Sequence, residues 1–260
     1  DDRGGGYSQY QHIRLTNWVK DPTFDYWGNF IYIKDQRNQK VWSTSLPPTS
    51  LIPEKYEVSF SQNYSNITRL NLNIETELEV VVPFETDLEI RYLTVNNKSS
   101  EKRLLELTSY VEIVLDDHSS YQMHPIFSKM RLESEFHSAS KTLLFHRLTK
   151  PSVNIPIFVS RIITPNASAK ITFETDRLRV LGRGGSVEFP NTFTQSEGFT
   201  LDPVCCWNIP VTLKPRSSQT FCFLYTAAYS RDTALANLAK YPSLEKIHDL
   251  IEFTRKAELN

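Results

Sequence analysis

The 260-residue sequence has only three cysteines and eight glycines, and no excess of charge of either sign. Cys205 and Cys206 are adjacent and Cys222 stands apart, so the set matches neither an even disulfide framework nor a zinc site with paired ligands. We therefore expect buried free thiols and a reducing compartment. No segment approaches the roughly 18 consecutive apolar residues that span a bilayer.

The balance of 29 basic and 30 acidic residues argues against nucleic acid or an anionic membrane as the main partner, because either partner usually leaves a basic footprint. The composition of 40% hydrophobic and 12% aromatic residues is sufficient for a substantial core. Helical periodicity is nearly absent before residue 228, and the missing crossover helices exclude a parallel α/β fold.

Period-two alternation takes the place of helical periodicity, with about fourteen to sixteen strand candidates. Residues 30–35 and 40–45 predict a hairpin. Residues 75–82 predict a half-buried strand whose three glutamates, Glu75, Glu77 and Glu79, form a solvent-facing side. Residues 88–95 and 103–115 predict the next strand pair, and the length of the second indicates a bend or a large sheet. The sequence therefore predicts an all-β sandwich or barrel.

The pattern changes after residue 228. Ser230 predicts the N-cap of a helix over 231–241, and Pro242-Ser243 predicts its end and the cap of a second helix. Leu244, Ile247, Leu250 and Ile251 form an apolar stripe on that second helix. We expect a further domain to cover the stripe, and the glycine-rich start at residues 1–6 is likewise typical of a piece of a longer protein.

Residues 173–185 combine acids, arginines and glycines, and are typical of a turn near a ligand or partner. The simplest interpretation is a surface hairpin whose charges pair with one another. Glu174 and Asp176 would share one face of a regular strand and could act as a glycosidase-like carboxylate pair. Salt bridges from these carboxylates to Arg177, Arg179 or Arg183 are the favoured alternative.

Trp27 and Tyr26 lie on an expected turn, where an aromatic face can hold the apolar face of a sugar or can simply fill the core. The spacing of the histidines matches no metal motif, and the sequence contains neither a phosphate loop nor a nucleophile elbow. The sequence therefore predicts no metal and no cofactor.

Four blocks resemble one family in order and spacing. They are Trp27-Gly-Asn-Phe-Ile-Tyr-Ile-Lys-Asp35, Leu107-Thr-Ser-Tyr-Val-Glu-Ile-Val-Leu115, His124-Pro-Ile-Phe-Ser-Lys129, and Phe173-Glu-Thr-Asp-Arg177 followed by Leu181-Gly-Arg-Gly184. The chain resembles the N-terminal β-sandwich of the phosphorylase-like region of cyclic β-1,2-glucan synthases, similar to glycoside hydrolase family 94.

This resemblance implies a large antiparallel β-supersandwich of the galactose-mutarotase type over residues 1–228. Residues 229–260 would be helical linkers toward an α/α barrel that carries the family's catalytic residues. Since those residues lie in the barrel, none maps onto this chain. The resemblance also implies a location on the cytoplasmic side of the bacterial inner membrane, as a soluble part of a longer membrane protein.

The resulting hypothesis is a non-catalytic, carbohydrate-associated domain whose partners are the barrel and a β-glucan oligosaccharide, with β-1,2 linkages. Arg177 and Arg183 would donate to glucan hydroxyls or to the barrel, with Glu174 and Asp176 orienting them. Trp27 and Tyr26 are the candidate sugar-stacking residues.

Two alternatives remain open. An autonomous mutarotase-like epimerase would need a histidine acid and a glutamate base, and His124 or His146 could supply the acid. A purely structural oligomerisation domain would form a homodimer without binding sugars.

Overall fold

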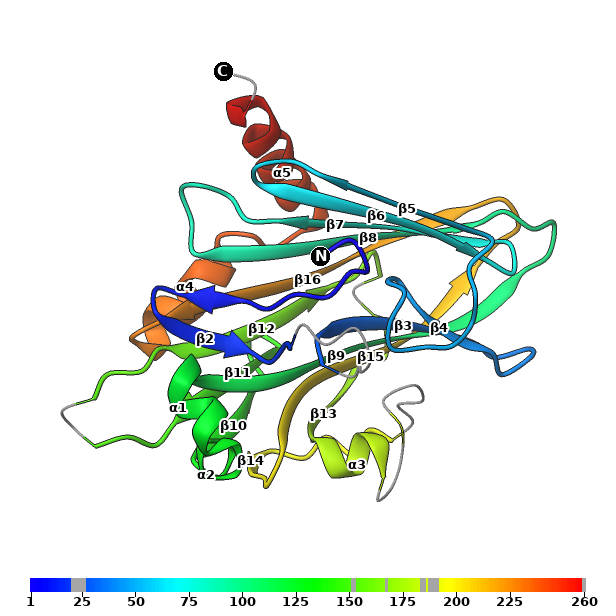
Figure 1. The fold of residues 1–260 in the computed structure, drawn as a ribbon. Helices are drawn as coiled ribbons and strands as arrows, with labels where there is room; N and C mark the ends of the chain where they lie inside the picture. The colour runs from blue at the N-terminus through cyan, green and yellow to red at the C-terminus, as the bar shows by residue number, and fades with distance from the viewer. Residues whose placement is uncertain (20–26, 151–152, 167, 183–185, 187–191, 259–260) are drawn as a thin grey trace.

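The structure is a computed structural model of the 260-residue chain, and it describes residues 1–19, 27–150, 153–166, 168–182, 186 and 192–258. Two antiparallel sheets face each other, and helices lie on their outer sides (Figure 1). The seven-stranded sheet contains β1 (Gln9–Tyr10), β2 (Ile13–Thr16), β3 (Asn29–Asp35), β4 (Val41–Ser43), β9 (Arg103–Asp117), β13 (Thr172–Asp176) and β15 (Pro203–Leu213). The nine-stranded sheet runs in the order β14 (Gly198–Phe199), β10 (Leu132–His137), β11 (Thr142–Arg147), β12 (Ile157–Ile163), β16 (Ser218–Ala228), β8 (Leu88–Asn97), β7 (Ile74–Val81), β6 (Tyr64–Asn71) and β5 (Lys55–Phe60).

The main core lies between the sheets and is built by alternation along the strands. On β9 the odd-numbered apolar residues point into this core, as the sequence predicts. Each fully buried apolar side chain of this size contributes about 1.5–3 kcal/mol relative to exposure. The inward residues of β9 are Leu105, Leu107, Val111, Ile113 and Leu115.

The long strand β9 is irregular near its C-terminal end, as its length predicts. Its pairing with β2 shifts register between Arg14 and Thr16, and Leu115 has a positive φ of 46°. Earlier along its length β9 pairs with β3 and β15 at once. The strand is therefore central to the seven-stranded sheet.

The expected pairing of residues 88–95 with 103–115 is wrong. Strand β8 pairs with β7 and β16, whereas β9 belongs to the other sheet. The polar segment between β8 and β9 crosses from one sheet to the other. There it meets the turn between β15 and β16, where the Arg216 N–H donates to the Ser99 carbonyl. Alternation reveals strands but does not identify their hydrogen-bonding partners.

Helices α4 (Arg231–Ala239) and α5 (Leu244–Glu258) form a layer outside the nine-stranded sheet. Both expected caps are confirmed: the Ser230 side chain accepts from the Thr233 N–H, and the Ser243 hydroxyl accepts from the Lys246 N–H at 3.3 Å. Ile247 and Ile251 are 0% and 1% exposed.

The sheet of this chain therefore covers the apolar stripe of the second helix, and the expectation that a further domain must cover it is wrong. The same packing corrects the expected solvent face of residues 75–82. Arg255 of α5 forms an ion pair with Glu79, whose side chain is only 15% exposed. The domain boundary at residue 228 stays a prediction.

The outer side of the seven-stranded sheet carries three short helices, α1 (His118–Met123), α2 (Pro125–Lys129) and α3 (Arg177–Leu181). Val180 and Leu181 of α3 are buried against Phe30, Tyr32 and Tyr110 on the even-numbered faces of β3 and β9. In the part of the chain that the structure describes, no helix is long and apolar enough to cross a membrane.

The helix layer on the nine-stranded sheet can be tested with one substitution and a matched control. We expect Ile251→Ala to lower the free energy of unfolding by about 2–4 kcal/mol, because it opens a cavity in a packed layer. The control Ile52→Ala removes the same atoms from a side chain that is 84% exposed, and should cost less than about 0.5 kcal/mol. Equal losses in urea titrations would contradict the packing of α5.

The three cysteines are free and buried, as expected, and each belongs to a different core cluster. Burial raises the pKa of the Cys205 thiol to about 12 and holds the pKa values of the Cys206 and Cys222 thiols well above the ordinary range. Since the thiolate is the reactive form, a raised pKa makes the folded thiols less reactive.

We expect a thiol-reactive disulfide reagent at about pH 8.5 to leave all three thiols of the native chain unmodified. In strong denaturant the same reagent should modify all three. Rapid modification of one thiol under native conditions would show that its layer opens locally.

Candidate functional site

The stretch that the sequence singles out is a strand followed by a helix. Strand β13 ends at Asp176, whose carboxylate accepts from the Leu178 N–H at 2.9 Å and caps α3. Helix α3 ends at Gly182, whose φ of 76° lies in the left-handed region that favours glycine. The expected surface hairpin is therefore wrong for residues 177–181. Arg183 and Tyr26 lie outside the described residues.

Glu174 is fully buried and acts as a clamp. Its carboxylate accepts from the backbone N–H groups of Thr175, Asp176 and Thr194, at 2.9, 3.1 and 2.8 Å. It also accepts from the hydroxyls of Thr194 and Ser196. Among the described residues, five hydrogen-bond donors thus converge on this one carboxylate. In the described residues Glu174 thus fastens the segment at 194–196 to β13 and does not orient Arg177.

The expected regular alternation from Glu174 to Asp176 is also broken. The pairing of β13 with β15 shifts register between these two residues. Glu174 is buried, whereas the Asp176 side chain is 22% exposed and lies 3.7 Å from Arg179, the expected salt bridge. Because of this shift, the structure does not place the two carboxylates on one face of the strand.

The carboxylate partners of Arg177 are Glu112 on β9 and Asp202 in the loop before β15. Its Nε lies 3.1 Å from Glu112 and donates to the Tyr110 hydroxyl at 2.9 Å, and its Nη1 lies 3.3 Å from Asp202. Burial alone would lower the pKa of Arg177. Tyr110, Glu112 and Asp202 outweigh burial, so the net pKa is raised and the guanidinium stays charged.

Lys129 completes the arrangement. Its ammonium pairs with Asp202 and lies 3.6 Å from Oε2 of Glu112, and the Asn17 side chain donates to the same Glu112 oxygen at 3.0 Å. Desolvation opposes the charge of Lys129, but the two carboxylates overcome it and raise its pKa. Two cations thus face two carboxylates around Glu112, which is 1% exposed. We call Arg177, Lys129, Glu112, Asp202 and Tyr110 the Arg177 network.

Sequence reasoning missed most of this network. Tyr110, Glu112 and Lys129 fall inside two of the blocks that carry the family resemblance, and this was the available signal. Asp202 gave no signal in the sequence. Trp27 is half-buried and precedes β3, where Asn29 pairs with Val111 next to Glu112. The structure therefore brings Trp27 to the same end of the sheet as the network.

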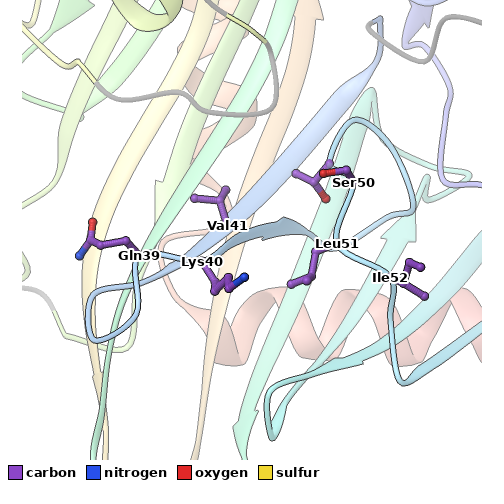
Figure 2. Close-up of a pocket in the computed structure, with 7 residues that line it drawn as sticks. Gln39, Lys40, Val41, Ser50, Leu51 and Ile52 are labelled. Atoms are coloured by element: carbon purple, nitrogen blue, oxygen red, sulfur yellow. The ribbon is translucent and has the colours of Figure 1, made fainter.

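The opposite end of these strands carries an open pocket of about 450 Å³. Figure 2 shows its two walls, with Gln39, Lys40 and Val41 on one side and Ser50, Leu51 and Ile52 on the other. Behind the pocket, Arg69 is fully buried and donates to the carbonyls of Ser45 and Leu51, and burial lowers its pKa to about 10.

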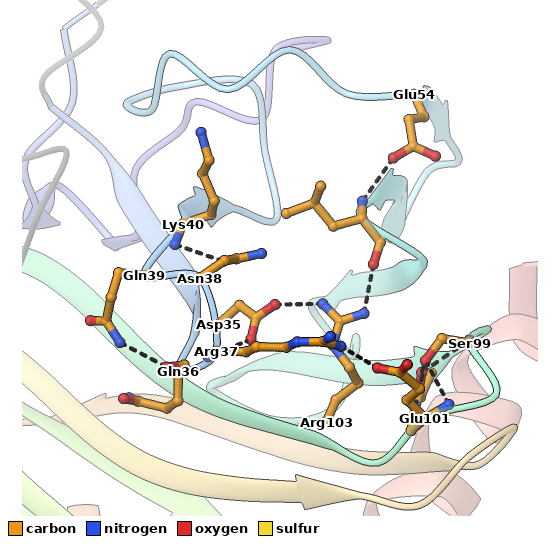
Figure 3. A network of polar contacts seen from close by, with 12 residues as sticks. Asp35, Gln36, Arg37, Asn38, Gln39, Lys40, Glu54, Ser99, Glu101 and Arg103 are labelled. Atoms are coloured by element: carbon orange, nitrogen blue, oxygen red, sulfur yellow. Dashed lines mark hydrogen bonds and ion pairs between the residues drawn. The ribbon is translucent and has the colours of Figure 1, made fainter.

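Next to this pocket, Arg103 holds Asp35 at 2.6 Å and donates to the Leu72 carbonyl (Figure 3). Arg37 pairs with Glu101 on the surface. The described residues that the sequence nominates as site residues, Trp27, Glu174, Asp176 and Arg177, do not lie at this end. The polar contacts at this end of the sheet join neighbouring loops to one another.

With the fold and this geometry in place, the class of protein is defined: the chain belongs to the family of glycosyl hydrolase 94 supersandwich domains, whose model matches residues 1–244. The supersandwich expected from the sequence is thereby confirmed.

Among curated proteins, the chain is 28% identical to the cyclic β-(1,2)-glucan synthase NdvB of Rhizobium meliloti over 98% of its length. It is 29% identical to the N,N'-diacetylchitobiose phosphorylase of Vibrio proteolyticus over 46% of its length. The chain spans 9% of the first relative and 16% of the second.

Solved structures share the fold. A bacterial glucoamylase complexed with acarbose aligns with a TM-score of 0.55 at 8% identity, over 94% of this chain and 32% of that one. A polysaccharide lyase aligns with a TM-score of 0.52 at 13% identity, over 88% of this chain and 30% of the other.

The buried carboxylate of the Arg177 network can be tested for its effect on stability. We expect Glu112→Gln to lower the free energy of unfolding by about 3 kcal/mol, since it leaves two partly buried cations short of a carboxylate. The matched control Glu101→Gln breaks an ion pair whose side chains are 71% and 58% exposed, and should cost less than about 1 kcal/mol. Equal losses in chemical denaturation would show that Glu112 is not the centre of the network.

Proposed function

We propose that this chain is a non-catalytic, carbohydrate-associated domain of a longer protein of the cyclic β-1,2-glucan synthase or glycoside phosphorylase type. In that protein it supports β-glucan binding and chain-length control by an α/α-barrel catalytic domain. The observation that carries the proposal is the match to a glucan synthase over 98% of this chain, together with the 9% of that relative which the match spans. The rest of that relative leaves ample length for a separate domain that performs the chemistry.

The surface proposed to serve this role is the exposed side of the Arg177 network. Arg177 and Asp202 are 33% and 29% exposed, so both can contact a partner. Glu112 and Tyr110 hold Arg177 from below, and Lys129 pairs with Asp202. A guanidinium beside a carboxylate offers donors and acceptors in fixed positions, which suits sugar hydroxyls or polar groups of a barrel. Trp27 lies at the same end and remains the proposed stacking residue.

One observation bears on the alternative that the chain is an epimerase. His146 and Glu133 are direct cross-strand neighbours on β11 and β10, with His146 Nε2 2.9 Å from the carboxylate. An acid and a base that act on one sugar ring must lie on either side of it, and this contact leaves no space between them. The observation favours a structural cross-strand pair, and the non-catalytic proposal is preferred.

Partners and location follow the proposal. The proposed partners are the barrel of the same protein and a β-1,2-linked glucan, and the proposed location is the cytoplasmic side of the inner membrane. A homodimer would be expected under the alternative structural role, in which the domain binds no sugar.

The test uses the longer protein that contains this chain. We expect Arg177→Ala to raise KM for linear β-1,2-glucan several-fold and to shift the product chain-length distribution, with little change in kcat, because it removes a binding contact away from the chemistry. Mass spectrometry of the products measures the shift. The control Arg37→Ala removes a surface arginine at the opposite end of the sheet. An unchanged distribution in a folded Arg177→Ala protein would refute the proposed role.

A further inference from the structure

A groove distinct from the Arg177 network lies at one end of the sandwich, between the β1–β2 hairpin and the segment that joins β7 to β8. One cavity of about 310 Å³ is lined by Tyr10, Phe84, Asp87 and Thr226, among others. A second cavity of about 190 Å³ shares Tyr7, Val82 and Glu89 with the first. The two cavities are therefore adjacent, and we call them together the Tyr7–Phe84 groove.

Exposed aromatic rings follow the groove along its length. Phe84 and Phe60 are each 60% exposed, Tyr7 is 42% exposed, and Tyr10 is half-buried. These rings come from three separate segments of the chain and converge on one depression. A converging set of exposed rings indicates a binding surface, whereas single exposed apolar residues need no explanation.

The groove is rich in acceptors and poor in cations. Among the described residues, the larger cavity is lined by Asp87 and Glu89 but by no lysine or arginine. Asp87 is exposed, and the Tyr10 hydroxyl reaches it at 3.4 Å. Arg91, which lines the smaller cavity, is neutralised by Glu89 at 2.8 Å. Such a lining disfavours phosphate and other anions, and it suits a neutral ligand that donates many hydrogen bonds.

The groove is also held in place by its surroundings. The Tyr229 hydroxyl donates to Gln11 at 2.8 Å, and its ring packs edge-on against Tyr10 with centroids 5.7 Å apart. The Thr226 hydroxyl donates to the Asp87 carbonyl. The Arg14 guanidinium lies 4.0 Å from the centre of the Tyr7 ring. Preformed walls reduce the ordering cost of binding.

We propose that the Tyr7–Phe84 groove is a binding site for a neutral oligosaccharide. The rings of Phe84 and Tyr10 lie against the C–H faces of successive sugar units, and Asp87 accepts hydrogen bonds from their hydroxyls. The volume of the larger cavity is at the lower end of the range for small-molecule sites, which fits a short stretch of sugar chain. The assignment follows from the lining of the groove, and it does not depend on the proposed role of the Arg177 network.

The test is calorimetric titration of the 260-residue chain with linear β-1,2-gluco-oligosaccharides and with cello-oligosaccharides. We expect measurable binding of at least one series, and a loss of at least about tenfold in affinity for Phe84→Ala and for Asp87→Asn. The control Phe253→Ala removes a ring that is 55% exposed and lines a neighbouring pocket beside Phe84. The control Asp249→Asn removes an exposed carboxylate on α5. Both controls should bind as the unchanged chain does.

The outcomes separate the groove from the Arg177 network. Binding that survives Arg177→Ala but not Phe84→Ala supports the groove. Binding that survives Phe84→Ala but not Arg177→Ala overturns the proposed groove site and leaves the proposed function standing. If no sugar binds, the proposed oligosaccharide site is overturned. If the neutral apolar dye Nile red then binds in a Phe84-dependent manner, the groove is an apolar docking surface instead, and the oligosaccharide proposal is equally overturned. Thermal denaturation of each variant verifies that it is folded.

Discussion

The alternation of side chains along β9 is the constraint on which the rest of the structure depends. Its odd-numbered residues, such as Val111 and Ile113, build the core between the sheets. Its even-numbered residues, such as Tyr110 and Glu112, point to the outer side, where α3 and Arg177 pack. Since successive side chains of a strand point to opposite faces, one strand supports the fold and the candidate site together. A slip of one residue would exchange the two sides and destroy both.

The two proposed surfaces have opposite physical characters. The Arg177 network is a charge-balanced cluster whose centre, Glu112, is removed from water, and its two cations, Arg177 and Lys129, are held by that buried carboxylate. The Tyr7–Phe84 groove is aromatic and acceptor-rich, and no cation from the described part of the chain lines its larger cavity. A glucan is neutral and carries both apolar C–H faces and hydroxyls, so the groove suits the chain of sugars itself. The network, with its exposed guanidinium, suits hydroxyls or polar groups of an adjoining domain equally well.

Much of the fold could be predicted from local pattern. The sequence predicts the strands, the buried thiols, and the helix caps at Ser230 and Ser243, because each of these features depends on residues close together in the sequence. The sequence does not predict which strands pair with one another. Strands β8 and β9 follow one another across a polar turn and yet enter different sheets. The cover for the apolar stripe of α5 was misassigned for the same reason, since an apolar face does not name what packs on it.

The sequence by itself determined the class of fold and the family, because period-two patterning and four spaced blocks can be recognised without coordinates. It also singled out residues 173–177 as candidates. Only the tertiary structure decided what those residues do. Glu174 became a buried clamp for the segment at 194–196, and Arg177 took its partners Glu112 and Asp202 from strand β9 and the loop before β15. Such partners are far apart in the sequence, and the register of three strands places them together. The physical reason is that a buried charge selects whichever neighbours remove its desolvation cost, and neighbours in space are set by sheet register.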